Sequence, residues 1–304
     1  MDENLILELK NEISGDVEIN KETIELYSHD ASLFEVKPEV VIFPKNIEDI
    51  KKIVQFVNKY KETHPNLSVT GRSAGTDMSG GPLNDSIIVE FSRYFNHTPN
   101  IGVDSGITEA GVYYRDFEAE TIKKGLLFPS YPASKSICAI GGIVNNNSGG
   151  EKSLKYGKTQ NYVRKLETVL ADGNTYEIRP LNKSELEAKI SQNDFEGNIY
   201  KNIYELVSKN YDLIQKSRPK VLKNSAGYNL WDVWNPATGI FDLTKLWVGA
   251  QGTLGIMSSA ELGLVPINKH RQMVVIFLPN MNNLGEIINK ILPLGPESFE
   301  SYDD

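Results

Sequence analysis

The sequence has little cysteine, no long apolar run and no excess of basic residues. Its one cysteine, Cys138, excludes an internal disulfide. No stretch reaches the roughly 18 apolar residues that a membrane-spanning helix needs. Forty acidic against 32 basic residues give a formal net charge of −8, which disfavours nucleic acid or an anionic membrane surface as a partner. The polar start, MDENLILELKNEI, lacks the features of a signal peptide, so we predict a cytoplasmic protein.

Two common nucleotide-binding motifs are also missing. There is no GxxxxGK[ST] stretch, and no GxGxxG opens a helix after the first predicted strand with an acidic residue about 20 positions later. These absences argue against a P-loop enzyme and a Rossmann dehydrogenase. The four histidines, His29, His64, His97 and His270, show no HxxxH or HxH spacing, so we predict no metal site.

The elements that are present alternate between strands and helices. VVIFP, from Val40 to Pro44, predicts a buried strand, and Asn46 with Asp49 three positions later predicts the start of a helix. The other predicted elements are strands at 67–71 and 86–91, a helix over 108–124, a hairpin at Asp172-Gly173, helices within 182–217 and a strand at 245–248.

Glycine gathers in three separate stretches, at 70–81, 131–150 and 249–257. Without a Cβ, glycine lets backbone amides approach a ligand closely and form concave sites that suit phosphate oxygens. Ordinary tight turns are the alternative interpretation of each stretch taken singly. In the first stretch the hydroxyls of Ser73, Thr76 and Ser79 could add hydrogen-bond donors, and Arg72 could neutralise a phosphate or pair with a carboxylate elsewhere.

Four motifs in order carry a resemblance to a known family. They are RSAGTDMSGG (72–81), PASKSICAIGGIVNNNSGG (132–150), Tyr156-Gly157 with VRKLETVLADG (163–173), and GAQGTLGIMSSAELGLVP (249–266). Together they resemble the FAD-linked oxidases of the vanillyl-alcohol oxidase and p-cresol methylhydroxylase (PCMH) type, nearest the D-lactate, glycolate and 2-hydroxyglutarate dehydrogenase branch. The resemblance implies an α+β fold in which FAD extends between a small N-terminal subdomain and a larger subdomain with a mixed sheet.

The resemblance also implies a division of the chain. Residues 1–37 would be an N-terminal helical segment, and residues 38–266 the PCMH-type FAD-binding domain. Residues 267–304 would begin a truncated α+β cap domain that binds substrate, with a strand from Met273 to Leu278 and a helix from Asn283 to Ile291. We therefore expect either a fragment or a shortened family member that a partner subunit completes.

Cofactor contacts are carried over from the family residue by residue. The first loop, Arg72 to Gly80, would wrap the FAD diphosphate, the second stretch would contact the diphosphate, ribityl chain and flavin ring, and the third would line the adenine end. Arg72 and Ser73 stand where some relatives have a histidine that bonds flavin covalently, so non-covalent FAD is expected. Gln251 replaces a common acidic residue. The implied cofactor-binding residues are Arg72, Ser73, Ala74, Gly75, Thr76, Asp77, Ser79, Gly80, Pro132, Ser134, Ser136, Ile140, Gly141, Gly142, Asn147, Gly149, Gly255 and Ile256.

The function implied is hydride transfer from the α-carbon of a small 2-hydroxy acid to FAD, with the electron acceptor and the catalytic residues left open. The alternatives are a non-catalytic flavin-binding subunit that needs a partner chain, and an enolpyruvyl-sugar reductase-like enzyme. Cys138 could approach the flavin or fill a buried space. The segment KNSAGYNLWDVW, residues 223–234, resembles a part of the family near the substrate side of the flavin, or its tryptophans simply anchor a loop.

Overall fold

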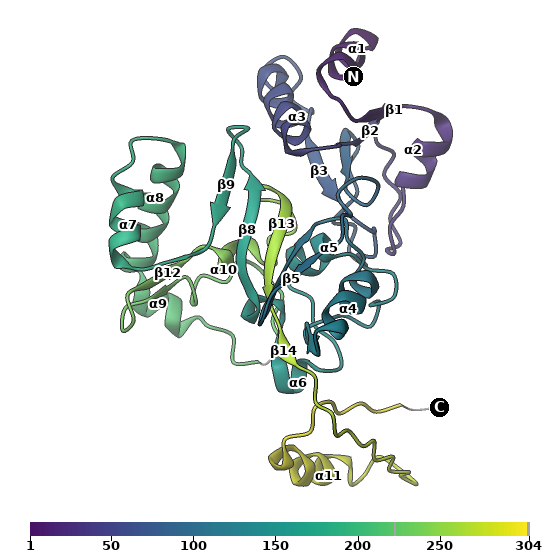
Figure 1. Ribbon diagram of the computed structural model, residues 1–304, viewed down its shortest axis with the longest axis vertical. Helices are drawn as coiled ribbons and strands as arrows, with labels where there is room; N and C mark the ends of the chain where they lie inside the picture. The colour runs from purple at the N-terminus through teal and green to yellow at the C-terminus, as the bar shows by residue number, and fades with distance from the viewer. Residues whose placement is uncertain (222, 303–304) are drawn as a thin grey trace.

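Two β-sheets form the body of the protein in a computed structural model, which describes residues 1–221 and 223–302 (Figure 1). The smaller sheet has four strands in the order β1-β2-β4-β3, and the larger has five in the order β5-β6-β13-β8-β9. The bounds are β1 Asp16–Glu18, β2 Val40–Phe43, β3 Val69–Arg72, β4 Ile87–Glu90, β5 Asn100–Ile101, β6 Ser105–Glu109, β8 Val163–Val169, β9 Thr175–Ile178 and β13 Ile256–Gly263.

The four-stranded sheet is built around two apolar strands. Every residue of β2 and β4 is buried, and these strands pair in parallel, as do β3 and β4. The helix α3 (Ile47–Tyr60) follows β2 and buries Ile50 and Ile53. Asn46 accepts a hydrogen bond from the amide of Asp49, which confirms the predicted start of this helix. The predicted strands on either side of the first glycine stretch are confirmed as β3 and β4.

All pairs in the five-stranded sheet are antiparallel, which corrects the expected mixed sheet. The mixed sheet is instead the smaller one, because β1 joins it antiparallel to β2. In the larger sheet β13 lies between β6 and β8, with Ala260 opposite Thr108 on one side and Leu166 on the other. The hairpin predicted at Asp172-Gly173 is confirmed as the turn between β8 and β9.

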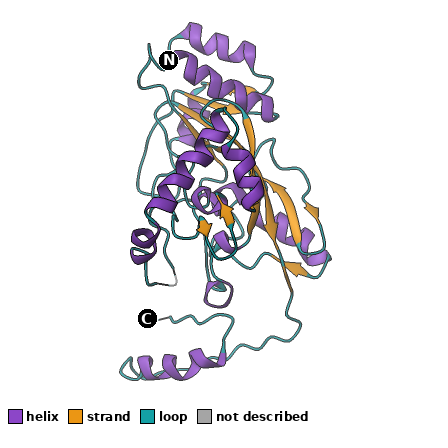
Figure 2. Ribbon diagram, turned by 90° about the vertical axis from the view of Figure 1, so that its left-hand side faces the viewer, coloured by secondary structure: helices purple, strands orange, loops and turns teal. Residues whose placement is uncertain are grey.

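Helices and short strands surround the two sheets (Figure 2). The helices predicted within 182–217 are confirmed as α7, α8 and α9. The remaining elements are α1 Glu3–Glu12, α2 Lys21–Tyr27, α4 Tyr114–Lys123, α5 Ile140–Asn145, α6 Ser153–Tyr156, α7 Lys183–Ile190, α8 Phe195–Lys209, α9 Tyr211–Lys216, α10 Thr244–Trp247, α11 Leu284–Ile291, β7 Leu126–Leu127, β10 Pro180–Leu181, β11 Trp234–Asn235, β12 Ile240–Asp242 and β14 Val265–Pro266, with 3₁₀ turns at Thr159–Asn161 and Leu292–Leu294.

Two of the secondary-structure predictions, at 108–124 and at 245–248, were wrong. The helix expected over 108–124 begins only at Tyr114, because residues 105–109 pair with β13 as a strand. The strand expected at 245–248 is mainly the short helix α10, whose Leu246 and Trp247 are buried. A four-residue apolar run fits a buried helical turn as well as a strand, so its sequence does not distinguish them.

The C-terminal segment, residues 267–302, extends away from the body (Figure 1). Its predicted helix is confirmed as α11, but its predicted strand is wrong, because residues 273–278 form no regular element. Met273 and Phe277 are 88% and 91% exposed. An apolar strand needs a neighbouring strand for its backbone hydrogen bonds, and none of the described residues provides one here. None of the described helices is long and apolar enough to cross a membrane.

We expect Asp49 to be a main anchor of the N-terminal segment. Its carboxylate is 1% exposed and accepts hydrogen bonds at 2.9 Å from the amides of Ser14 and Lys45 and from the Ser14 hydroxyl. Asp49→Ala leaves two amides without these acceptors, so the free energy of unfolding in urea should fall by about 2–3 kcal/mol. The exposed Asp85 is the control, and Asp85→Ala should change it by less than about 0.5 kcal/mol. Equal effects would contradict the anchoring role.

Candidate functional site

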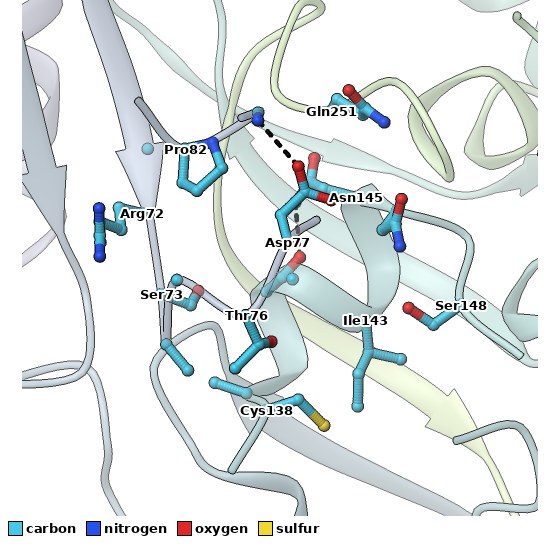
Figure 3. A pocket seen from close by; sticks show the side chains of 18 of the residues that line it. Arg72, Ser73, Thr76, Asp77, Pro82, Cys138, Ile143, Asn145, Ser148 and Gln251 are labelled. Carbon is cyan, nitrogen blue, oxygen red and sulfur yellow. Dashed lines mark hydrogen bonds between the residues drawn. The ribbon is translucent and has the colours of Figure 1, made fainter. Parts of the chain in front are cut away.

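A pocket of about 600 Å³ lies where the two sheets meet (Figure 3). Its wall combines the loop after β3, the stretch around α5, and the start of β13 with the loop before it. The three glycine stretches of the sequence therefore come together at one place. Its volume is in the range of 300–1,000 Å³ that is typical of pockets for small molecules and cofactors.

The first loop holds its shape through its own side chains. The carboxylate of Asp77 accepts hydrogen bonds from the amide of Ser79 at 3.1 Å, its hydroxyl at 2.7 Å and the amide of Gly81 at 2.8 Å. Burial raises the pKa of Asp77, but these hydrogen bonds outweigh burial and leave the pKa below its usual value. The hydroxyl of Ser73 donates to the carbonyl of Ala110, beyond the end of β6. Since a hydroxyl donates one hydrogen bond, Ser73 and Ser79 are already committed as donors, whereas Thr76 faces the pocket (Figure 3).

Arg72 supports this loop from beneath. Its guanidinium donates to the carbonyls of Tyr27 at 3.2 Å and His29 at 2.6 Å, and it lies 5.0 Å from the centre of the Tyr27 ring. It is also close to Gly75, where a Cβ would approach its Nη2 atom to 2.5 Å. Gly75 has φ +66°, which favours glycine. Burial lowers the pKa of Arg72, but an arginine stays protonated, so a positive charge lies directly below the glycine backbone.

The second stretch brings α5 close to the same loop. The amide of Gly141 donates to the carbonyl of Ala110 at 2.8 Å, and a Cβ at this position would meet that oxygen and the Ser73 hydroxyl. The next residue, Gly142, differs from Gly141 in having free space where a Cβ would lie. A Cβ there would meet no protein atom within 4 Å, and Gly142 is exposed to the pocket. This glycine keeps a part of the pocket wall open for a ligand.

The third stretch closes the pocket from the side of β13. Gly255 has φ +153°, and a Cβ there would lie 2.9 Å from Leu170, Thr168 and Val169, so only glycine fits. Gln251, the residue at the family's common acidic position, has φ +51°. Its backbone N–H donates a hydrogen bond to the carbonyl of Asn145 at 2.9 Å. Its side chain lies beside the Asp77 loop, because a Cβ at Gly81 would lie 3.5 Å from the Gln251 side-chain oxygen and 3.0 Å from the Asp77 carboxylate. Because the side chain of Gln251 is a neutral amide, it adds no second negative charge near Asp77.

Most of the expected cofactor residues line this pocket, but some lie elsewhere. Asn147 and Gly149 line a smaller neighbouring cavity, and the Asn147 amide donates to Gln160 at 2.6 Å. Ile140 is fully buried in the core, while Gly80 packs near Phe34. Ser136 is exposed outside both cavities. The expected residues that line the larger pocket are Arg72, Ser73, Ala74, Gly75, Thr76, Asp77, Ser79, Pro132, Ser134, Gly141, Gly142, Gly255 and Ile256.

The sequence analysis did not predict several of the lining residues, and it left the role of Cys138 undecided. Phe91 and Ala110 lie just beyond β4 and β6, and a strand end beside a glycine stretch was the only signal that could have found them. Cys138 is buried on the pocket wall, and burial raises its thiol pKa to about 11. The thiol is therefore neutral at pH 7 and is not poised as a nucleophile. The other lining residues that were not predicted include Ile137, Ile143, Asn145, Asn146, Ser148 and Met257.

These features fit FAD in three respects. The pocket has the volume of a cofactor site, its glycine positions leave backbone exposed where a Cβ would intrude, and a buried cation underlies the glycine loop. Apolar side chains such as Ile137 and Met257 form other parts of the wall, which suits an aromatic ring system.

Comparison with known proteins agrees with this fit. Residues 38–179 match the family described as "FAD binding domain". The chain is 32% identical to a D-2-hydroxyglutarate dehydrogenase of Pantoea ananatis over 82% of this chain and 24% of the relative. It is 27% identical to the glycolate oxidase subunit GlcD of Bacillus subtilis (91% and 48%) and to a D-lactate dehydrogenase of Archaeoglobus fulgidus (86% and 47%). The chain thus spans between about a quarter and a half of these relatives.

Solved structures share the fold at lower identity. An alkyldihydroxyacetonephosphate synthase superposes with a TM-score of 0.60 at 17% identity, covering 89% of this chain and 41% of the other. The BBE-like 1 protein of Physcomitrella patens gives 0.56 at 12% identity, covering 86% and 44%. The fold is therefore α+β and of the PCMH type, and the chain carries an FAD-binding domain of the FAD-linked oxidase family, related to D-2-hydroxyglutarate and D-lactate dehydrogenases.

Proposed function

We propose that this chain binds FAD non-covalently in the larger pocket and provides the flavin part of an enzyme that oxidises a 2-hydroxy acid. The observation that supports this most strongly is the convergence of three glycine stretches, far apart in sequence, on one pocket between the sheets. We infer the substrate class from the names of the relatives and the cofactor site from the pocket.

Each part of the pocket has a role in this proposal. The amides of the Arg72–Gly80 loop bind the diphosphate, and Arg72 below them balances its charge. Asp77 positions the loop without contacting the ligand. Gly141 and Gly142 give the ring and ribityl chain close access to α5, while Gly255 and Ile256 line the adenine end. When bound, FAD accepts a hydride from the substrate's α-carbon, and the surrounding protein orients the two and excludes water.

The division at residues 37 and 266, with the start of a cap domain beyond it, remains part of the proposal, as does a cytoplasmic location. A second candidate function is a flavin-binding subunit that works with a partner chain. It is favoured by the exposed apolar run at 273–277, which would bury its side chains against another polypeptide. Co-purification of a second protein with the native chain would support this candidate.

We expect the purified chain to be yellow and to release its FAD on acid or heat denaturation. The first loop has no histidine, and the Cys138 thiol is neutral at pH 7, so neither offers a nucleophile for a covalent bond. The measurement is the absorbance spectrum of the supernatant and of the precipitated protein. A protein that takes up no FAD would contradict the binding site, and flavin that stays with the precipitate would contradict non-covalent binding.

Gly142→Val should weaken FAD binding while leaving the fold intact. A Cβ at position 142 would meet no protein atom within 4 Å, so the valine side chain would extend from there into the space assigned to the cofactor. We expect the dissociation constant for FAD, measured by fluorescence titration, to rise about tenfold or more. The control is Gly285→Val on the exposed face of α11, where a Cβ also meets nothing within 4 Å. Gly75→Val is a poorer probe because φ +66° and Arg72 would strain the loop itself.

The isolated 304-residue chain should oxidise hydroxy acids slowly. The described residues that line the larger pocket include three ionisable side chains, and none is available as a base. Arg72 is protonated and donates to the carbonyl of His29, the carboxylate of Asp77 accepts hydrogen bonds within its own loop, and the thiol of Cys138 is neutral. Anaerobic mixing of the FAD-loaded chain with D-lactate, glycolate or D-2-hydroxyglutarate should bleach the flavin absorbance more slowly than about 1 per second. Faster bleaching would show that these residues already contain a complete active site.

A further inference from the structure

A second, smaller cavity of about 200 Å³ adjoins the larger pocket. The two share Pro132, Asn146 and Ser148, and Ser148 is labelled at the edge of the larger pocket in Figure 3. Two lysines, Lys158 and Lys223, line the smaller cavity. Its remaining lining residues are Asn147, Gly149 and Ser225, so no acidic side chain of the described chain lines it.

Lys158 is a buried charge for which the described residues provide no counterion. It is 7% exposed, and its ammonium group donates to the carbonyl of Asn224 at 3.2 Å and to the hydroxyl of Ser225. No carboxylate of residues 1–221 and 223–302 forms a salt bridge with it. A buried ammonium that lacks a counterion is costly, and an ammonium has three donors, of which these contacts use two.

Other lysines of low exposure in this protein are compensated. Lys152 pairs with Glu297 at 3.2 Å, and Lys245 pairs with Asp242 at 3.4 Å. Lys158 has the opposite environment: burial lowers its pKa first, and the positive charge of Lys223 lowers it further. A bound anion in the cavity would remove this penalty, as Glu297 and Asp242 do for the other two lysines.

We propose that Lys158 and Lys223 bind a carboxylate group of the substrate in this smaller cavity, beside the FAD pocket. The assignment rests on the proposed function, which supplies the hydroxy-acid substrate class. The side-chain amide of Asn146 and the hydroxyl of Ser225 also line the cavity and would be hydrogen-bond donors to the carboxylate, whereas the side-chain amide of Asn147 is bonded to Gln160. The cavity has about seven times the volume that a water molecule occupies in the liquid, which suits a carboxylate with its first few carbon atoms.

The FAD diphosphate is the other oxyanion that could meet these lysines, and the lining of the cavity argues against it. No residue of the Arg72–Gly80 loop lines the smaller cavity, whereas that loop forms one wall of the larger pocket. The diphosphate therefore has its own site, and the lysines are left for a small anion that enters next to the flavin.

The test uses glutarate, a dicarboxylate with no hydroxyl group to oxidise, titrated by calorimetry into the FAD-loaded chain. Its neutral diamide is the matched ligand control and should not bind. Lys158→Met keeps an unbranched side chain but removes the ammonium group, and it should weaken glutarate binding about tenfold or more without changing the dissociation constant for FAD. Lys223→Met, at an exposed position, should weaken it severalfold and tests the proposal even if Lys158→Met folds poorly.

Lys183→Met, whose side chain is 83% exposed on α7, is the control variant and should bind glutarate like the parent. If parent and lysine variants bind glutarate equally, or the FAD-loaded parent does not bind it, the carboxylate site is wrong while the flavin site stands. If Lys158→Met loses FAD instead of glutarate, the cavity holds the cofactor's phosphate and the assignment is overturned. A parent that takes up no FAD contradicts the proposed function itself.

Discussion

The pocket depends on the pairing of β13 with β6 on one side and β8 on the other. This arrangement joins residues about 90 to 160 positions apart in the chain into one sheet. It also places Ile256, at the start of β13, next to Gly71 at the end of β3, where a Cβ on the glycine would lie 3.9 Å from Ile256. The third glycine stretch therefore faces the first across a narrow space, and α5 completes the wall.

Bare backbone and buried positive charge occur together in this structure. Arg72 lies below the glycine loop and is held by carbonyl groups, while Lys158 lies in the smaller cavity and is held by a carbonyl and a hydroxyl. The direct partners of both cations are neutral, although the carboxylates of Asp30 and Glu90 partly balance the charge of Arg72 from a distance. Both positions thus favour anions, which is consistent with a diphosphate in one place and a carboxylate in the other.

The body and the C-terminal segment differ in how far local sequence determines structure. Residues 284–291 form the predicted helix because a helix satisfies its backbone hydrogen bonds within itself. Residues 273–278 have a strand-like sequence but no neighbouring strand among the described residues, so their apolar side chains remain exposed. The same dependence on neighbours explains why residues 105–109 became a strand: β13 was available to pair with them.

By itself the sequence determined the α+β class, the strands around the first glycine stretch, the turn at Asp172-Gly173 and the family, because these follow from local spacing and motifs. Most of the cofactor residues that it predicted line the larger pocket, although other residues make up more than half of the wall. Only the tertiary structure decided that Arg72 faces protein carbonyls, that Ile140 belongs to the core, and that Lys158 and Lys223 share a cavity. The direction of a side chain and the partner of a buried charge depend on residues distant in the chain, which no local pattern specifies.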